Sequence, residues 1–382
     1  MRRALLRAGL SLFGAIALTA VFFVVMGWTA FGHSPSRERL ERMKKSKQWA
    51  GHGFENPQPL WNDGWGSVKA MFDASADASP HGEVPVVRGG EERFQTPPPT
   101  GLRITWLGHS TTLIELDGLR VLTDPIFSER ASPYQFLGPK RWYAPLIPLE
   151  KLPRLDAVII SHDHYDHLDE ATVRALKGNR FFVPLGIGAH LEYWGIPASD
   201  ITELDWWEEA KVGEVRFVST PARHASGRQL LDQGGTLWTS WSLVGPSHRV
   251  FYSGDTGLFP AMREIGDKLG PFDAVMIEIG QYHRAWPDWH IGPEQAVRAA
   301  GILRGKVMFP IHWGLFMLAL HAWTEPIERA RVAAEGAGMP LLMPKPGQSV
   351  EPGAPPPFEK WWPDVPWQTA AQHPIVSTKV DQ

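Results

Sequence analysis

Residues 161–167 hold three histidines and two aspartates directly after the apolar run 157–160. The apolar run predicts a short buried strand, so these polar residues lie in the loop where the strand ends. Imidazoles and carboxylates suit zinc, iron or manganese, and alternate residues of an extended loop can reach one ion. With His162 and His164 on one ion, Asp166 and His167 are displaced far enough to bind a second. A solvated polar loop is the alternative, and the density of ligand-type side chains disfavours it.

Three further candidate ligands follow other strand-like runs. His224 lies in the turn after residues 215–220, Asp255 lies in a glycine-flanked turn, and His312 follows residues 307–311. Taken alone, each is equally well explained as a polar residue satisfied at a strand end. Four successive strand ends that each carry a metal-type ligand instead predict one shared site.

The order of these motifs resembles the metallo-β-lactamase fold superfamily over roughly residues 101–345. The resemblance implies an α/β fold, an αββα sandwich, with two divalent metal ions bound at one edge. Ligand type favours zinc, while iron and manganese remain open. The metal ligands implied by the superfamily pattern are His162, His164 and His224 on one ion, Asp166, His167 and His312 on the other, and Asp255 as the bridge.

Within the superfamily, four segments look like the N-acylphosphatidylethanolamine-hydrolysing phospholipase D family: residues 105–110, 122–128, 138–141 and 203–208. Residues 254–257 and 311–314 match it too, but are shared more widely. A lactonase branch that acts on L-ascorbate 6-phosphate is a more distant relative with a similar metal pattern. Phe136 and Trp289 depart from the phospholipase pattern, which has a Tyr and a Gln there, and this departure concerns the lipid specificity.

This resemblance implies a phospholipase D-type phosphodiesterase that acts on N-acylphosphatidylethanolamine or related glycerophospholipids through a metal-bridging hydroxide. Asp166 and His290 are the expected catalytic residues. His290 stands just before a helix expected to begin at Pro293 and would donate to the phosphoryl oxygens; the alternative is a helix-entry residue bonded to backbone. His290, Phe136 and Trp289 are the expected substrate contacts. Two other functions remain open: a lactonase-type hydrolase of a small phosphorylated sugar, and a non-catalytic binding module of the same fold.

Four other polar residues near these motifs have less specific expectations. Asp124 would either orient a ligand imidazole from behind or initiate the turn before Pro125. His109 is expected to hold a loop by hydrogen bonding. Asp163 and Tyr165 alternate with the ligands, so their side chains should point away from the metal ions.

Composition excludes several functions. The chain of 382 residues has a net charge of −3, and it shows no basic, aromatic-interleaved patch that would indicate a nucleic-acid partner. The absence of cysteine excludes disulfides, thiolate ligands and a cysteine nucleophile. The sequence gives no indication of oligomeric state.

The N-terminus predicts attachment to a membrane. Three arginines precede an uncharged apolar stretch, residues 8–32, which is long enough to cross a bilayer. An uncleaved single-pass anchor is favoured over a signal peptide cleaved near Ala17 or Ala20, and over a buried core helix. The basic residues within 33–47 compete with the N-terminal arginines, so the membrane face stays open.

The rest of the chain divides into three expected regions. After the anchor at 1–32, residues 33–100 form a juxtamembrane helix and an extended arm; residues 101–345 form the catalytic domain; and residues 346–382 form a Pro- and Trp-rich tail. Short antiparallel strands are predicted at 102–107, 111–116 and 120–123. Helices are predicted at 170–177, 258–268, 293–303 and 324–334. This order favours two sheets covered by outer helices.

Overall fold

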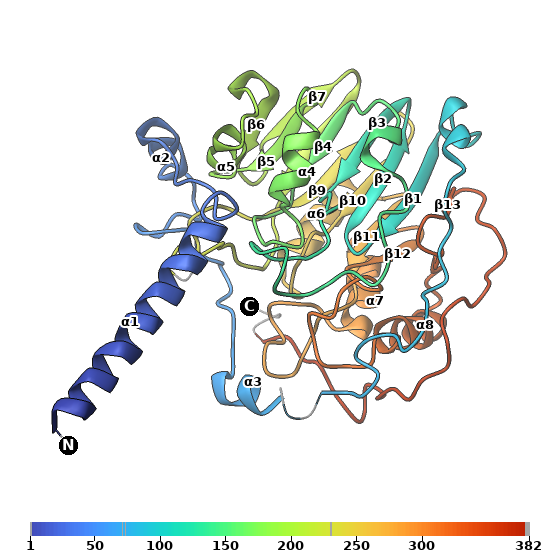
Figure 1. The fold of residues 1–382 in the computed structure, drawn as a ribbon. Coiled ribbons are helices and arrows are strands. Elements are labelled where there is room, and N and C mark those ends of the chain that lie inside the picture. The colour runs from blue at the N-terminus through green and yellow to red at the C-terminus, as the bar shows by residue number, and fades with distance from the viewer. Residues whose placement is uncertain (1, 71, 73, 230, 379–382) are drawn as a thin grey trace.

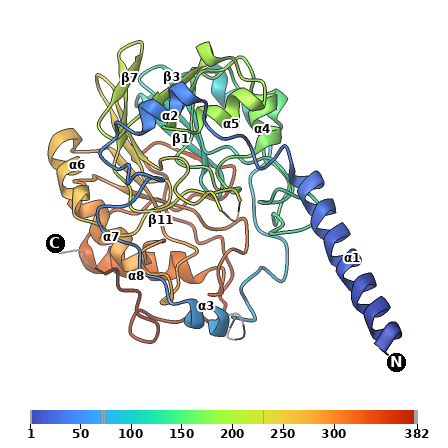
Figure 2. The ribbon, with the colours of Figure 1, turned by 90° about the vertical axis from the view of Figure 1, so that its left-hand side faces the viewer.

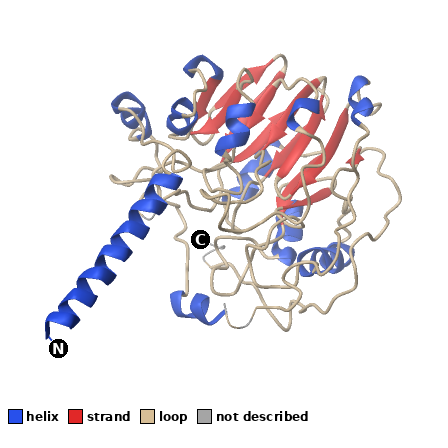
Figure 3. Ribbon diagram, in the orientation of Figure 1, coloured by secondary structure: helices blue, strands red, loops and turns tan. Residues whose placement is uncertain are grey.

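Two mixed β-sheets pack face to face in the computed structural model, which describes residues 2–70, 72, 74–229 and 231–378, with the backbone alone for residues 2–9 and 20 (Figures 1 and 3). The strands of the first sheet are, in spatial order, β13 (Ser349–Val350), β1 (Leu102–Gly108), β2 (Thr111–Leu116), β3 (Leu119–Thr123), β4 (Ala157–Ile159), β5 (Phe181–Pro184) and β6 (Ile201–Leu204). Those of the second are β12 (Met308–Ile311), β11 (Ala274–Glu278), β10 (Arg249–Tyr252), β9 (Ser240–Val244), β8 (Val215–Thr220) and β7 (Glu209–Val212).

Apolar residues on both faces of the inner strands explain the layering. In β2, Ile114 contributes to the core between the sheets, whereas its neighbour Leu113 contributes to a second core under the outer helices. Successive strand residues point to opposite faces, so a strand covered on both sides is apolar throughout. Phe182 of the first sheet stacks on Phe217 of the second, with ring centroids 4.5 Å apart.

Helices cover the outer faces of the two sheets (Figure 3). The first sheet carries α4 (Glu170–Ala175) and α5 (Gly188–Tyr193), and the second carries α6 (Ala261–Leu269), α7 (Pro293–Ile302) and α8 (Glu325–Ala337). Short 3₁₀ helices occur at Glu91–Gln95, Leu149–Lys151 and Ala198–Asp200. The predicted αββα sandwich is therefore confirmed, and the four predicted helices in it lie within a few residues of their expected bounds.

The arm and the tail lie against the sandwich. Within residues 33–100 the structure forms α2 (Arg37–Met43) and α3 (Gly64–Ala70), and the remainder runs along the body. Val87 N donates to Pro346 O at 2.7 Å, which ties the arm to the tail. In the tail, β13 extends the first sheet and the buried Trp361 stacks on Trp313, with centroids 5.3 Å apart. The packing unit thus continues beyond the expected boundary at residue 345.

The N-terminal helix α1 (Arg2–Gly27) projects away from the body in both views (Figures 1 and 2). Its segment Leu10–Gly27 has a mean hydropathy of 2.3 and is long and apolar enough to cross a membrane. The chain just after the helix is bonded to the body. Arg228 donates to Ala30 O from both Nε, at 2.9 Å, and Nη2, at 2.7 Å.

Candidate metal centre

The candidate ligands gather at one edge of the sandwich because each follows the end of a strand. His162 follows β4, His224 follows β8, Asp255 follows β10 and His312 follows β12. Three non-glycine residues at this edge have a left-handed backbone: His109, Asp124 and His312 adopt positive φ values of 54°, 32° and 64°. Such conformations are uncommon for residues other than glycine and persist where the surrounding structure holds them.

Three imidazoles form the first group. His164 Nδ1 lies 3.0 Å from His162 Nε2 and 3.2 Å from His224 Nε2. Asp255 Oδ2 lies 3.7 Å from both Nε2 atoms. Four potential ligand atoms from three different loops therefore converge on one point.

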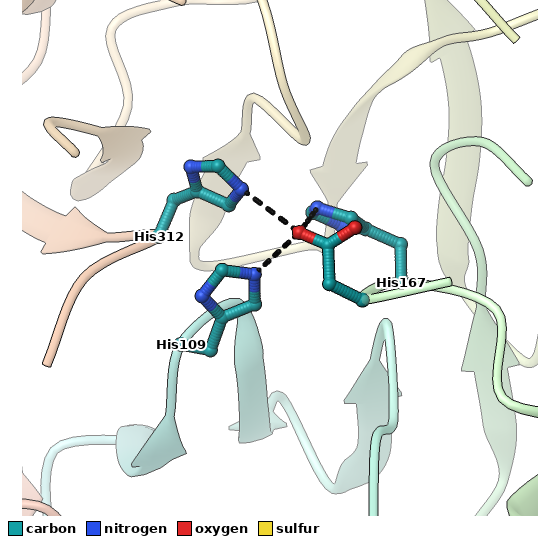
Figure 4. A group of neighbouring side chains, drawn as sticks. His109, His167 and His312 are labelled. Atoms are coloured by element: carbon teal, nitrogen blue, oxygen red, sulfur yellow. Dashed lines mark hydrogen bonds and ion pairs between the residues drawn. The ribbon is translucent and has the colours of Figure 1, made fainter. Parts of the chain in front are cut away.

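Asp166, His167 and His312 form the second group. Asp166 Oδ2 lies 3.3 Å from the Nε2 atoms of both histidines, and the three labelled rings of His109, His167 and His312 surround this oxygen (Figure 4). Asp255 lies 3.2 Å from His167 Nε2 through Oδ1 and 3.2 Å from His312 Nε2 through Oδ2. Because Asp255 contacts both groups, its carboxylate is placed as a bridge between them.

The donor atoms in the two groups fit divalent cations. Ligands about 2.0–2.1 Å from a tetrahedral zinc ion are separated from one another by about 3.3 Å. The separations here are 3.0–3.7 Å, and in each group the candidate ligand atoms all lie within 4.8 Å of one another. His167 Nε2 and Asp255 Oδ1 are buried without a hydrogen-bond partner among the described residues. A bound cation would satisfy both atoms, so the residues present fit a two-ion centre.

Asp124 supports the second group from behind. His167 Nδ1 donates to Asp124 Oδ2 at 2.7 Å, and Tyr252 Oη donates to the same oxygen at 2.6 Å. Ser161 N donates to Oδ1 at 2.7 Å. Of the two expectations for Asp124, the structure thus shows the contact with a candidate ligand imidazole. This contact fixes the proton on Nδ1 and directs Nε2 towards the second group.

The other polar residues of the loop face away from the cluster. Asp163 accepts hydrogen bonds from Gly227 N and Thr236 Oγ1, both at 2.8 Å. Tyr165 Oη donates to Arg228 O at 2.7 Å.

His109, which precedes the loop in the sequence, lies closer to the centre than expected, because its Nε2 contacts Asp166 Oδ2 at 2.9 Å.

Glu278 was not anticipated from the sequence. It is the last residue of β11 and is fully buried. His290 Nδ1 donates to its Oε2 at 2.9 Å, and His312 Nδ1 lies 3.2 Å from the same oxygen. The only sequence signal is an acidic residue directly after the apolar residues 274–277.

The two groups differ in electrostatics. Burial, with the neighbouring imidazole of His167, lowers the pKa of His162 well below its usual range, and burial likewise lowers the pKa of His224. Burial also opposes the charged forms of His167 and His312, yet Asp255 and other carboxylates raise both pKa values well above the usual range. Against the effect of burial, these two imidazoles hold the pKa of Asp255 well below its ordinary value.

The cluster opens into a cavity of about 440 Å³. The wall combines candidate ligands, aromatic and polar side chains, and two residues of the arm: His164, Asp166, Asp255, His312, Gln281, Trp286, Trp289, His290, Leu318, Asn62 and Ser67. His290 and Trp289, both expected to contact substrate, therefore lie at this cavity. A larger cavity of about 730 Å³ between α3 and the tail contains none of the candidate ligands.

Phe136 lies elsewhere, contrary to the expectation that it shapes the substrate pocket. It is half exposed and is not part of the cavity wall. Its ring centroid lies 6.1 Å from that of Phe22 in α1. The physical reason is the path of its loop: Tyr134 Oη donates to Phe23 O at 3.0 Å, which draws the loop onto the helix.

Comparison with known proteins agrees with this geometry. A family model described as a beta-lactamase superfamily domain matches residues 119–313. The chain belongs to this superfamily, and the protein is a metallo-hydrolase of that class.

Two curated proteins and one solved structure are similar to much of the chain. An uncharacterized protein of Mycobacterium tuberculosis is 50% identical over 267 residues, which cover 68% of this chain and 72% of the relative. The N-acyl-phosphatidylethanolamine-hydrolyzing phospholipase D 1 of Caenorhabditis elegans is 38% identical over 247 residues, 61% of this chain and 69% of the relative. A metallo hydrolase from Ignicoccus hospitalis, Igni18, shares the fold, with a TM-score of 0.51 and 24% identity over 65% of this chain and 97% of that one.

Proposed function

We propose that the protein is a phospholipase D-type phosphodiesterase that hydrolyses N-acylphosphatidylethanolamine or a related glycerophospholipid. The observation that carries this proposal is the pair of ligand groups joined by Asp255 beneath a cavity with Trp and Leu in its wall. The similarity to the Caenorhabditis elegans phospholipase D supports the substrate class.

The chain's own residues would divide the chemistry between them. Two divalent ions held by the seven ligands would supply an activated water molecule and neutralise charge on the phosphoryl oxygens. His290 donates from Nδ1 to Glu278, so it can donate from Nε2 to a phosphoryl oxygen in the cavity only as the doubly protonated imidazolium, whose charge the Glu278 carboxylate offsets. The Asp166 side chain is 14% exposed, against 2% for Asp255. Its carboxylate is thus the better placed of the two to accept a hydrogen bond from the attacking water.

Apolar surface next to the cavity favours a lipid over a small phosphorylated sugar. The arm contributes Asn62 and Ser67 to the cavity wall, and next to them in the sequence α3 exposes Trp65, at 84%, together with part of Val68. Exposed large apolar side chains beside a binding site mark surfaces that meet a lipid or another apolar partner. The acyl chains of a substrate bound at the metal centre would lie against this surface.

The reaction is tested with N-acylphosphatidylethanolamine in ¹⁸O-labelled water. Attack at phosphorus places the label on phosphatidic acid and releases unlabelled N-acylethanolamine. His290→Ala should lower turnover by about 100- to 1,000-fold, the typical effect of removing one transition-state donor, with both metal ions retained. Label in a carboxylate would show opening of a lactone or ester and would overturn the phosphodiesterase proposal.

We also propose that α1 anchors the enzyme in a membrane. The test is deletion of residues 1–27, which removes the apolar helix and keeps the bonded segment after it. This variant should leave the membrane fraction, retain activity on bis(4-nitrophenyl) phosphate, and lose activity on vesicles. If it still sedimented with vesicles, the apolar surface of α3 would carry the attachment, and Trp65→Ser in the truncated chain would release it.

A further inference from the structure

Glu278 connects two histidines that have different expected roles. Its Oε2 accepts from His290 Nδ1 at 2.9 Å and lies 3.2 Å from His312 Nδ1, while its Oε1 accepts from Thr256 N. The two imidazole rings are nearly parallel, with centroids 5.1 Å apart and an interplanar angle of 14°. One buried carboxylate therefore faces a candidate metal ligand and the candidate phosphoryl donor at the same time.

We propose that Glu278 is a positioning residue that keeps a proton on Nδ1 of both His290 and His312. A carboxylate only accepts hydrogen bonds, so each ring must turn an N–H towards it. The unprotonated Nε2 of His312 then points at the second ligand group, 3.2 Å from Asp255 Oδ2, whereas the Nε2–H of a doubly protonated His290 is left to donate to the substrate. The inference rests on the proposed metal centre and deepens it.

Because Glu278 is buried, its carboxylate requires N–H groups as partners. The side chain has no exposed surface, and a buried carboxylate without donors is strongly unfavourable. His290 Nδ1 and Thr256 N donate to the carboxylate, and His312 Nδ1 lies 3.2 Å from it as an ion-pair partner. Loss of the carboxylate would therefore change both the metal ligand and the phosphoryl donor, which no substitution of either histidine alone would do.

A third cation is the competing explanation, because potential ligand atoms of Asp255, Glu278, His290 and His312 lie within 4.8 Å of one another. Such an ion would require His312 to bind metals through both ring nitrogens and so to lose both N–H protons. The 2.9 Å contact between His290 and Glu278 is already an ordinary charge-assisted hydrogen bond. The hydrogen-bonded arrangement thus accounts for the geometry without a further ion.

The decisive variant is Glu278→Gln. The amide keeps the shape, but if its oxygen retains the bond from Thr256 N, its NH₂ faces two imidazole N–H groups. The rings must then shift the proton to Nε2, where it blocks metal binding. Glu115→Gln is the matched control: Glu115 is also buried, at 3% exposure, but bonds Arg103 and Arg120 in the first sheet.

Nitrogen NMR of zinc-loaded, ¹⁵N-histidine-labelled full-length protein shows directly which ring nitrogens carry a proton. Resonances assigned with His290→Ala and His312→Ala should show Nδ1–H in the wild type and in Glu115→Gln, and loss of Nδ1–H with a proton on Nε2 in Glu278→Gln. Wild-type rings that lack Nδ1–H would overturn the inference.

Zinc titration supplies the second readout. Glu278→Gln should weaken one of two ions by about 10- to 100-fold, the usual effect of removing a group that orients a ligand, and Glu278→Asp should recover part of it. Unchanged binding of two ions in Glu278→Gln, or three ions in the wild type, would overturn the inference. These readouts use no lipid, so a failure to hydrolyse phospholipid would count against the proposed substrate and leave this inference standing.

Discussion

The two halves of the candidate centre are supported by different chemistry. In the first group, the ring nitrogens that face away from the centre meet neutral partners: His162 Nδ1 donates to Ser161 Oγ and His224 Nδ1 donates to Trp289 O, both at 2.9 Å. In the second group the corresponding nitrogens of His167 and His312 face the carboxylates of Asp124 and Glu278.

This difference bears on how tightly each ion is held. A carboxylate behind an imidazole fixes its orientation and makes the ring a stronger ligand. Against the effect of burial, Asp255 raises the pKa values of His167 and His312 and the carboxylates behind the two rings add to this, whereas burial lowers the pKa values of His162 and His224. The second group should therefore bind its ion more tightly than the first.

Removing a ligand from either half should have the largest effect. His164→Ala and His167→Ala should each lower turnover by about 1,000-fold or more, because both ions are expected to act on one phosphoryl group. The metal content of the two variants, measured by elemental analysis, should differ. After moderate dialysis, His164→Ala should keep the ion of the second group, whereas His167→Ala should keep little of either.

Equal metal contents in these two variants would contradict the inference that the second group binds its ion more tightly than the first. Full activity in a metal-free preparation would remove the metal centre altogether. Circular dichroism should show that both variants keep the fold, since neither imidazole packs in the core between the sheets.

Substitution of the carboxylate behind His167 should have the next largest effect. Asp124→Asn keeps the volume but replaces an acceptor by an NH₂ group opposite either His167 Nδ1 or Ser161 N. Removal of such a supporting group typically costs about 10- to 100-fold in metal affinity. Zinc titration should assign that loss to the tighter of the two ions, and a loss confined to the weaker ion would contradict the assignment.

The sequence predicts those features whose residues form a pattern within a short segment, and not those that depend on contacts between distant residues. The clustering of the candidate ligands could be predicted because they alternate within one short segment after an apolar strand, and the two-sheet architecture because strand and helix patterns are local. Glu278 could not, because a single acid at a strand end has no pattern, and its partner His290 lies 12 residues away. Phe136 was misplaced because its loop packs on α1, and β13 was missed because it has only two residues.

Stepwise removal of metal should give a smaller but direct measure of the asymmetry. In a competition with a chelator of known affinity, the two ions should leave in separate steps, with dissociation constants about 10-fold or more apart, a difference of at least about 1.4 kcal/mol. The ion retained longer should be the one whose loss is accelerated in Asp124→Asn. A single step with two equivalent ions would show that the carboxylates do not distinguish the halves.

Ser161→Ala should have the smallest effect, and it tests the neutral side of the comparison. Ser161 Oγ accepts from His162 Nδ1 and donates to Asp124 Oδ2, so the change removes one contact from each half. Asp124 keeps His167, Tyr252 and the Ser161 backbone amide, and should hold the second group in place. His162 loses a neutral hydrogen bond worth about 1 kcal/mol, which corresponds to about a five-fold loss for the weaker ion in zinc titration. A larger loss for the tighter ion would mean that the serine hydroxyl, rather than the carboxylate alone, orients the second group.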